Sequence, residues 1–112
     1  MKFKLIGSWL MLTCCLSLAA DVTFYEGAVC DKAAGFCADR KGVSLEMTQR
    51  YLGDAAKVKL EARIEETGRQ YFDGTRFTMT GGLTCHIQEQ QCWTSRLRQK
   101  RHAQVIQLLF GK

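Results

Sequence analysis

The sequence predicts a small, disulfide-stapled α+β domain, and three observations lead to this fold class. Two cysteine pairs, Cys30 with Cys37 and Cys85 with Cys92, share the spacing C-x6-C. Short β-prone segments flank each pair, whereas helical periodicity is confined to separate stretches. Segregated strands and helices joined by short turns favour an antiparallel sheet covered on one face over a parallel βαβ arrangement.

Residues 1–20 have the features of a secretory signal peptide. Two lysines give a positive start, residues 5–18 are almost wholly apolar or small, and small residues precede Asp21. The apolar run is shorter than the roughly 18 residues that span a bilayer, so we expect cleavage and no permanent membrane anchor. Neither cysteine of this leader follows the Gly, Ala or Ser that a lipoprotein site needs.

The remaining chain, residues 21–112, is expected to form a single domain of 112 − 20 = 92 residues. Without the two leader lysines its formal charge falls from +5 to +3. Its four cysteines permit three disulfide pairings, and an oxidising compartment favours their oxidation. Because local pairs need the least loop closure, we expect Cys30 to pair with Cys37 and Cys85 with Cys92.

Residues 21–68 are expected to form a β-hairpin followed by two helices. The expected elements are strands at 22–25, 28–30 and 36–38 and helices at 44–52 and 54–67. Turn residues at 31–35 predict the hairpin, which a Cys30–Cys37 disulfide would close. Ser44 is suited to cap the first helix and Asp54 the second, which Gly68 would end.

The second helix carries two apolar strips, so we expect it to pack on two sides. The larger strip is Ala56, Leu60 and Ile64, and the smaller one is Ala55, Val58 and Ala62.

Residues 70–93 predict an antiparallel β-meander. Strands at 70–72 and 75–80 are separated by Asp73-Gly74, a strong hairpin signal. Gly81-Gly82 permits a second reversal before a strand at 83–87. A final amphipathic helix follows from the spacing of His102, Val105, Ile106 and Leu109, and it should end near Gly111.

An internal repeat is suggested by an offset of 55 residues between 23–53 and 78–111. Thr23, Gly27 and the first cysteine pair align without gaps to Thr78, Gly82 and the second pair. Each copy is followed by a helix that ends in two bulky residues and a glycine. The alternative is that crosslinked β-hairpins converge on these residue types without duplication.

The run AVCDKAAGFCADRKGVS at residues 28–44, with YLG at 51–53, resembles the YcgJ-like family. The later FT…GLTC and LFG segments are similar to the same family, whereas the basic stretch at 96–101 has no clear counterpart. This family comprises small exported enterobacterial proteins, some carried on prophages. The resemblance implies export and paired cysteines, and it implies no activity or catalytic residues.

Three kinds of reactive site are weighed and disfavoured. Cys85, His86 and Cys92, with the first cysteine pair, could ligate zinc, but six intervening residues are too many for the usual knuckle. Thiol-disulfide catalysts place their cysteines two residues apart at a helix N-terminus, unlike these strand-like pairs. His86 should face away from the core, His102 should be a partly buried structural residue, and neither has a local serine or acidic partner. We therefore expect no catalytic, cofactor-binding or metal-binding residues.

The C-terminal segment concentrates positive charge. Residues 21–95 hold nine lysines and arginines against eleven acidic residues, whereas residues 96–112 hold five cations and no acidic residue. The candidate partner-binding residues are Trp93, Arg96, Arg98, Lys100 and Arg101. They could bind an acidic protein surface, anionic lipid or nucleic acid, the last being disfavoured. The alternatives are a solvated basic loop and a tryptophan that packs over the second disulfide.

The function expected from the sequence is that of a non-catalytic exported protein, periplasmic or secreted. It would bind another exported protein or the cell envelope, and an inhibitor of an envelope-targeting hydrolase belongs to this class. The alternative is a small envelope enzyme, which a deep cleft with convergent titratable groups would favour.

Overall fold

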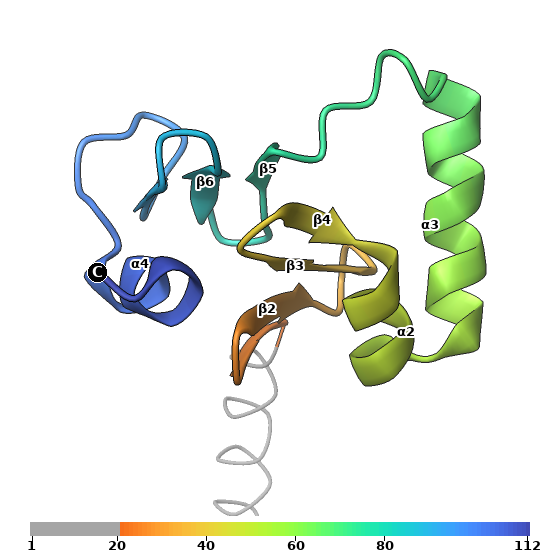
Figure 1. The fold of residues 1–112 in the computed structure, drawn as a ribbon, viewed down its shortest axis with the longest axis horizontal. Helices are drawn as coiled ribbons and strands as arrows, with labels where there is room; N and C mark the ends of the chain where they lie inside the picture. The colour runs from red at the N-terminus through yellow and green to blue at the C-terminus, as the bar shows by residue number, and fades with distance from the viewer. Residues whose placement is uncertain (1–20) are drawn as a thin grey trace, which may run out of the picture.

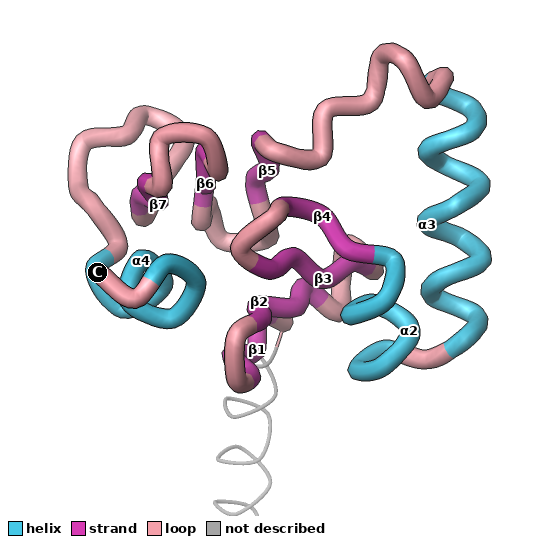
Figure 2. The backbone as a smooth tube through the Cα atoms, in the orientation of Figure 1, coloured by secondary structure: helices cyan, strands magenta, loops and turns pink. Residues whose placement is uncertain are grey.

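The computed structural model describes residues 21–112, so the expected signal peptide at 1–20 lies outside the described residues. Two antiparallel sheets lie side by side, with one helix at one end of the molecule and two at the other (Figures 1 and 2). Within residues 21–112 every helix is too short or too polar to cross a bilayer. The predicted α+β class is confirmed, although two sheets replace the single expected one.

The first sheet has four strands where the sequence predicted a hairpin with a short leading strand. Its elements are β1 (Val22–Tyr25), β2 (Ala28–Asp31), β3 (Phe36–Asp39) and β4 (Gly42–Ser44), in that spatial order. Cys30 lies directly opposite Cys37 in the register of β2 and β3. The fourth strand was missed because it has only three residues and merges into the helix that follows.

Helix α2 (Leu45–Leu52) begins as predicted, because the Ser44 side chain accepts a hydrogen bond from the Met47 amide at 3.0 Å. Thr48 is fully buried and joins the helix to the sheet. Its hydroxyl accepts from the Cys37 amide at 2.9 Å and donates to the Ser44 carbonyl at 2.7 Å. The helix is thus fixed beside the first disulfide.

Helix α3 (Asp54–Thr67) corrects two expectations. Gly53 is its N-cap and makes no side-chain capping bond, whereas Asp54 lies inside the first turn and accepts from Gln49 Nε2 at 2.8 Å. The strip of Ala55, Val58 and Ala62 is exposed, with Val58 at 62%. Leu60 and Ile64 are the only buried residues of this helix, so it packs on one side.

Residues 70–80 do not form the predicted hairpin. Only β5 (Arg76–Thr78) forms there, and Asp73-Gly74 lies in the chain that leads to it. The Gly74 carbonyl accepts from the Val43 amide at 2.8 Å, and the Thr75 carbonyl accepts from the Ile87 amide at 2.8 Å. A turn does form at Asp73-Gly74, where the Arg76 amide donates to the Asp73 carbonyl at 3.5 Å, but no strand directly precedes it and the flanking backbone bonds to tertiary neighbours.

The second sheet contains β5, β6 (Thr84–His86) and β7 (Gln91–Trp93), with a reversal at Gly81-Gly82 between the first two strands as predicted. Helix α4 (Ala103–Phe110) then ends at Gly111, whose φ of 72° suits glycine. One core joins both sheets and two helices. Its members include Val29, Phe36, Leu60, Ile64, Phe77, Met79, Leu83, Val105, Ile106 and Leu109.

The two halves of the fold share an order of elements. Each has a hairpin with a directly opposed cysteine pair, then an eight-residue helix that ends at a glycine. The pairing of Ala38 with Val43 in the first half corresponds to the bridge between Trp93 and Arg101 in the second. In the first half the helix starts eight residues after the second cysteine, and in the second half it starts eleven residues after it. The second half therefore has three extra residues between its hairpin and its helix.

Candidate functional site

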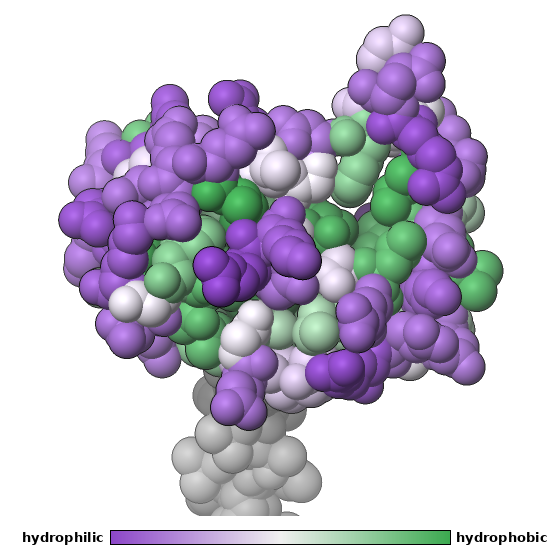
Figure 3. Space-filling model, viewed as in Figure 1, coloured by the Kyte–Doolittle hydropathy of each residue, from purple (hydrophilic) through white to green (hydrophobic). Residues whose placement is uncertain are grey.

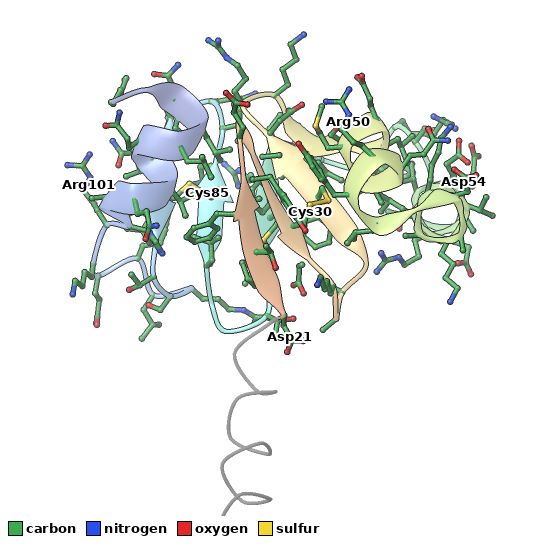
Figure 4. The ribbon with its side chains drawn as sticks, turned by 90° about the horizontal axis from the view of Figure 1, so that it is seen from below. Asp21, Cys30, Arg50, Asp54, Cys85 and Arg101 are labelled. Atoms are coloured by element: carbon green, nitrogen blue, oxygen red, sulfur yellow. A yellow bond between two sulfur atoms is a disulfide. The ribbon has the colours of Figure 1, made fainter. Side chains whose placement is uncertain are left out.

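The two disulfides form as predicted, one in each sheet. Cys30 pairs with Cys37 across β2 and β3 with a Cα separation of 4.0 Å, and Cys85 pairs with Cys92 across β6 and β7 with 4.1 Å. All four cysteines are fully buried, and Figure 4 shows the bridges near the labelled Cys30 and Cys85. Each bridge therefore crosslinks two adjacent strands of one sheet.

The predicted basic residues lie on one ordered loop, residues 94–101, which we call the basic arch. It joins β7 to α4 at the end of the molecule opposite α3 (Figure 1). The Thr94 amide donates to the Lys100 carbonyl at 2.9 Å, and the Arg98 amide donates to Ser95 at 3.1 Å. Because its ends are also held by the bridge between Trp93 and Arg101, the arch is closed by its own backbone.

Trp93 is half-buried at the base of the basic arch. The His86 ring meets it edge-on, with centres 5.1 Å apart, and the Arg98 guanidinium carbon lies 5.5 Å from its ring centre. Such an arrangement is a cation–π contact. Trp93 thus supports the arch, and it offers a partner less free surface than the sequence suggested.

The four predicted cations of the basic arch are exposed but have different contacts. Arg98 covers Trp93, and Arg101 donates from Nε to Gln91 Oε1 at 3.0 Å. Arg96 and Lys100 are exposed. Sequence reasoning missed Leu97, which is 74% exposed between two arginines and gives the arch an apolar contact surface. Its position between charged neighbours in a loop was the available signal.

His86 lies outside the core cluster and packs on Trp93, but the structure corrects the expectation that it has no acidic partner. Its side chain is only 15% exposed, and Nδ1 lies 3.6 Å from Glu89 Oε2. This nitrogen is buried and has no hydrogen-bond partner in the structure. A local acidic neighbour is therefore present after all, because the turn between β6 and β7 brings Glu89 back over the end of β6.

His102 has the structural role that was expected of it. It is the N-cap of α4, where Nδ1 accepts from the Val105 amide at 3.3 Å. The ring is partly buried and meets Phe24 edge-on, with centres 6.1 Å apart. An Nδ1 that accepts a hydrogen bond requires the proton of a neutral ring to reside on Nε2.

Asp31 is a buried carboxylate that sequence reasoning did not single out. Oδ2 accepts from the Thr80 amide at 2.7 Å, and Oδ1 accepts from the Thr80 hydroxyl and the Ala34 amide at 3.1 Å each. The residue is fully buried and joins the end of β2 to the turn between β5 and β6. A charged residue that closes an apolar strand beside Cys30 was the signal that could have identified it.

Comparison with known proteins places the chain in a family without an established activity. The family model described as "YcgJ protein" matches residues 22–110. A relative from Escherichia coli (strain K12), "Uncharacterized protein YcgJ", is 33% identical over 66 residues. That match covers 59% of this chain and 48% of the relative, so it spans about half of the relative's length. No solved structure matches the chain. Because the family model covers both disulfides, both sheets and α4, the chain belongs to the YcgJ protein family.

Proposed function

We propose that this protein is a non-catalytic exported binding module that engages an acidic surface of another exported or envelope protein through the basic arch. The observation that carries the proposal is the arch itself, an ordered loop with four cations and an exposed Leu97. No acidic residue occurs from Trp93 to Lys112. Uniform charge steers an acidic partner, and an exposed apolar side chain at its centre supplies buried area.

Export is supported by the state of the cysteines. All four cysteines of the described chain are joined in disulfides, which persist in oxidising compartments. A periplasmic or secreted location is therefore part of the proposal, together with the signal peptide at residues 1–20.

A binding role is also supported by the geometry of the arch. Its backbone hydrogen bonds and the Arg98–Trp93 contact restrain the loop without the help of a partner. Preorganised loops lose less conformational entropy on binding. The alternative function, a small envelope enzyme, would use His86 and Glu89, whose carboxylate lies 3.6 Å from the imidazole.

The experiment is capture of partners from periplasmic extract by the exported protein and two charge-reversed variants. Arg96→Glu with Lys100→Glu reverses the exposed cations of the arch. Arg40→Glu with Lys41→Glu reverses two exposed cations in the corresponding turn of the first half. Melting temperatures establish that each variant is folded.

We expect the arch variant to bind the captured protein at least about tenfold more weakly than wild type, and the control to bind normally. Wild-type affinity should fall as salt is raised, and the arch variant should lose most of this dependence. Equal affinity and equal salt dependence in both variants would reject the arch as the binding surface. Turnover of a substrate by the exported protein, abolished by His86→Gln, would favour the enzyme instead.

A further inference from the structure

A cavity of about 270 Å³ lies between α3 and the two sheets, at the end of the molecule opposite the basic arch. Its lining combines α3, β3, β4, β5 and the segment that leads to β5. The lining residues that matter here are Phe36, Leu60, Arg63, Ile64, Arg76 and Phe77. Figure 3 shows hydrophobic side chains around a hollow between α3 and the rest of the protein.

The interior of this cavity is aromatic and aliphatic. Phe36 and Phe77 meet edge to face with ring centres 6.0 Å apart, and Leu60 and Ile64 come from the buried side of α3. The cavity exists because α3 packs mainly on α2 and presents only these two buried side chains to the sheets. An open pocket of this size with such walls favours an apolar guest, since an enclosed apolar cavity of about 150 Å³ already holds benzene.

The polar part of the lining is cationic. Arg63 from α3 and Arg76 from β5, the edge strand of its sheet, are the charged residues of the lining, and none of the lining residues is acidic. Arg63 Nη2 donates to the Ala34 carbonyl at 2.8 Å, which positions the group and leaves its other N–H donors for a ligand. Neither arginine forms an ion pair within 4.0 Å among residues 21–112. Asp73 is nevertheless near enough to Arg76 for the positive charge to help lower the pKa of Asp73.

We infer that this cavity binds a single-chain amphipathic carboxylate of medium length, with its apolar tail between the phenyl rings and its carboxylate on Arg63 and Arg76. Guanidinium groups match a carboxylate in charge and in bidentate geometry. The volume suits one short acyl chain or one substituted ring and is too small to enclose both chains of a two-chain lipid. This site is separate from the basic arch, so an experiment can reject the ligand proposed here without rejecting the proposed function, and the reverse also holds.

Amide chemical shifts of the exported protein, recorded during titration with decanoate, test the assignment. Shifts should be largest for cavity residues such as Ile64, Phe72 and Thr78. Decanol, with the same tail and no charge, should bind about tenfold more weakly. Absence of saturable shifts with decanoate, or shifts confined to the basic arch, would overturn the inference.

Two single variants and a matched control locate the carboxylate. Arg63→Met and Arg76→Met remove one guanidinium each, and Arg69→Met removes an exposed arginine that pairs with Glu65 outside the cavity. Each cavity variant should weaken decanoate binding about tenfold and leave decanol binding unchanged, whereas the control should change neither. Arg63→Met also removes the hydrogen bond to the Ala34 carbonyl and could destabilise the fold. In that case Arg76→Met alone tests the carboxylate assignment. Equal decanoate affinity in Arg76→Met and the control would overturn the carboxylate assignment.

Discussion

At the scale of single residues, Asp31 shows how one buried group can hold two halves of a small domain together. Its carboxylate receives three hydrogen bonds, two of them from Thr80, which is 49 residues away in the sequence. A buried carboxylate is costly to desolvate, and here backbone amides and a hydroxyl compensate for the loss of water.

Replacement of Asp31 tests this crosslink. Asp31→Ala should lower the free energy of unfolding by about 2–4 kcal/mol, because the Thr80 and Ala34 amides would lose their acceptor. Asp39→Ala is the control, since its carboxylate accepts only from the Lys41 amide in an exposed turn, and about 1 kcal/mol is expected. Urea unfolding measures both, and equal losses would contradict the crosslinking role.

A second prediction at this scale concerns Asp73. The pKa of Asp73 is held below its ordinary value mainly by the Thr75 hydroxyl, which donates a hydrogen bond to this carboxylate. The Thr75 amide, which also donates to it, is the second cause. A lowered pKa in the folded state contributes stability above the pKa of the unfolded chain, and this contribution is lost as pH falls through the folded pKa.

Thr75→Val should therefore raise the pKa of Asp73 towards its ordinary value, whereas Thr75→Ser should keep it low. Carboxyl carbon NMR during an acid titration measures both values. An unchanged pKa in the valine variant would show that the hydroxyl is not the main cause.

At the scale of elements, each hairpin is held by its own disulfide, and each bridge spans a sequence separation of 7. Loss of either bridge should cost about 2–3 kcal/mol, because the short loop constrains the unfolded chain. Cys30→Ala with Cys37→Ala and Cys85→Ala with Cys92→Ala make a matched pair of variants. Equilibrium unfolding in urea should show similar losses, and a loss below about 1 kcal/mol would contradict the entropic account for that hairpin.

Helix α3 offers a test of its one-sided packing. Leu60→Ala should cost about 2 kcal/mol, because it removes buried methyl groups beside an existing cavity. Val58→Ala should change stability by less than about 0.5 kcal/mol, because Val58 is 62% exposed on the opposite side. A large loss for Val58→Ala would restore the two-sided packing that the sequence suggested.

At the scale of the whole molecule, the two halves have the same order of hairpin and helix and share one hydrophobic core. Val29 and Phe36 of the first half belong to the same buried cluster as Phe77 and Val105 of the second. The shared order of hairpin and helix supports the internal duplication, which stays a prediction. The three extra residues of the second half fall in the basic arch, so the candidate binding loop is what distinguishes the halves.

A shared core predicts that the halves unfold together. NMR signals of the Cys30 and Val105 amides should disappear at the same urea concentration, because neither half can keep its buried residues covered alone. Two separate midpoints would show that each half is an independent unit.

The sequence by itself determined the disulfide pairs and the helices α2, α3 and α4. These features depend on local signals: a six-residue spacing across one turn, the Ser44 cap, and glycines that end helices. The candidate basic residues were also recognised, since a run of cations without acids is visible in one dimension.

Tertiary structure decided what depends on neighbours that are distant in the chain. The Asp73-Gly74 pair predicted a hairpin; the turn forms but residues 70–72 are not a strand, and the carbonyls of Gly74 and Thr75 instead accept hydrogen bonds from the amides of Val43 and Ile87. Burial of Asp31 and His86, the covering of Trp93 by Arg98 and the cavity beneath α3 arise in the same way. Local preferences amount to about 1 kcal/mol each, so long-range hydrogen bonds and packing can override them.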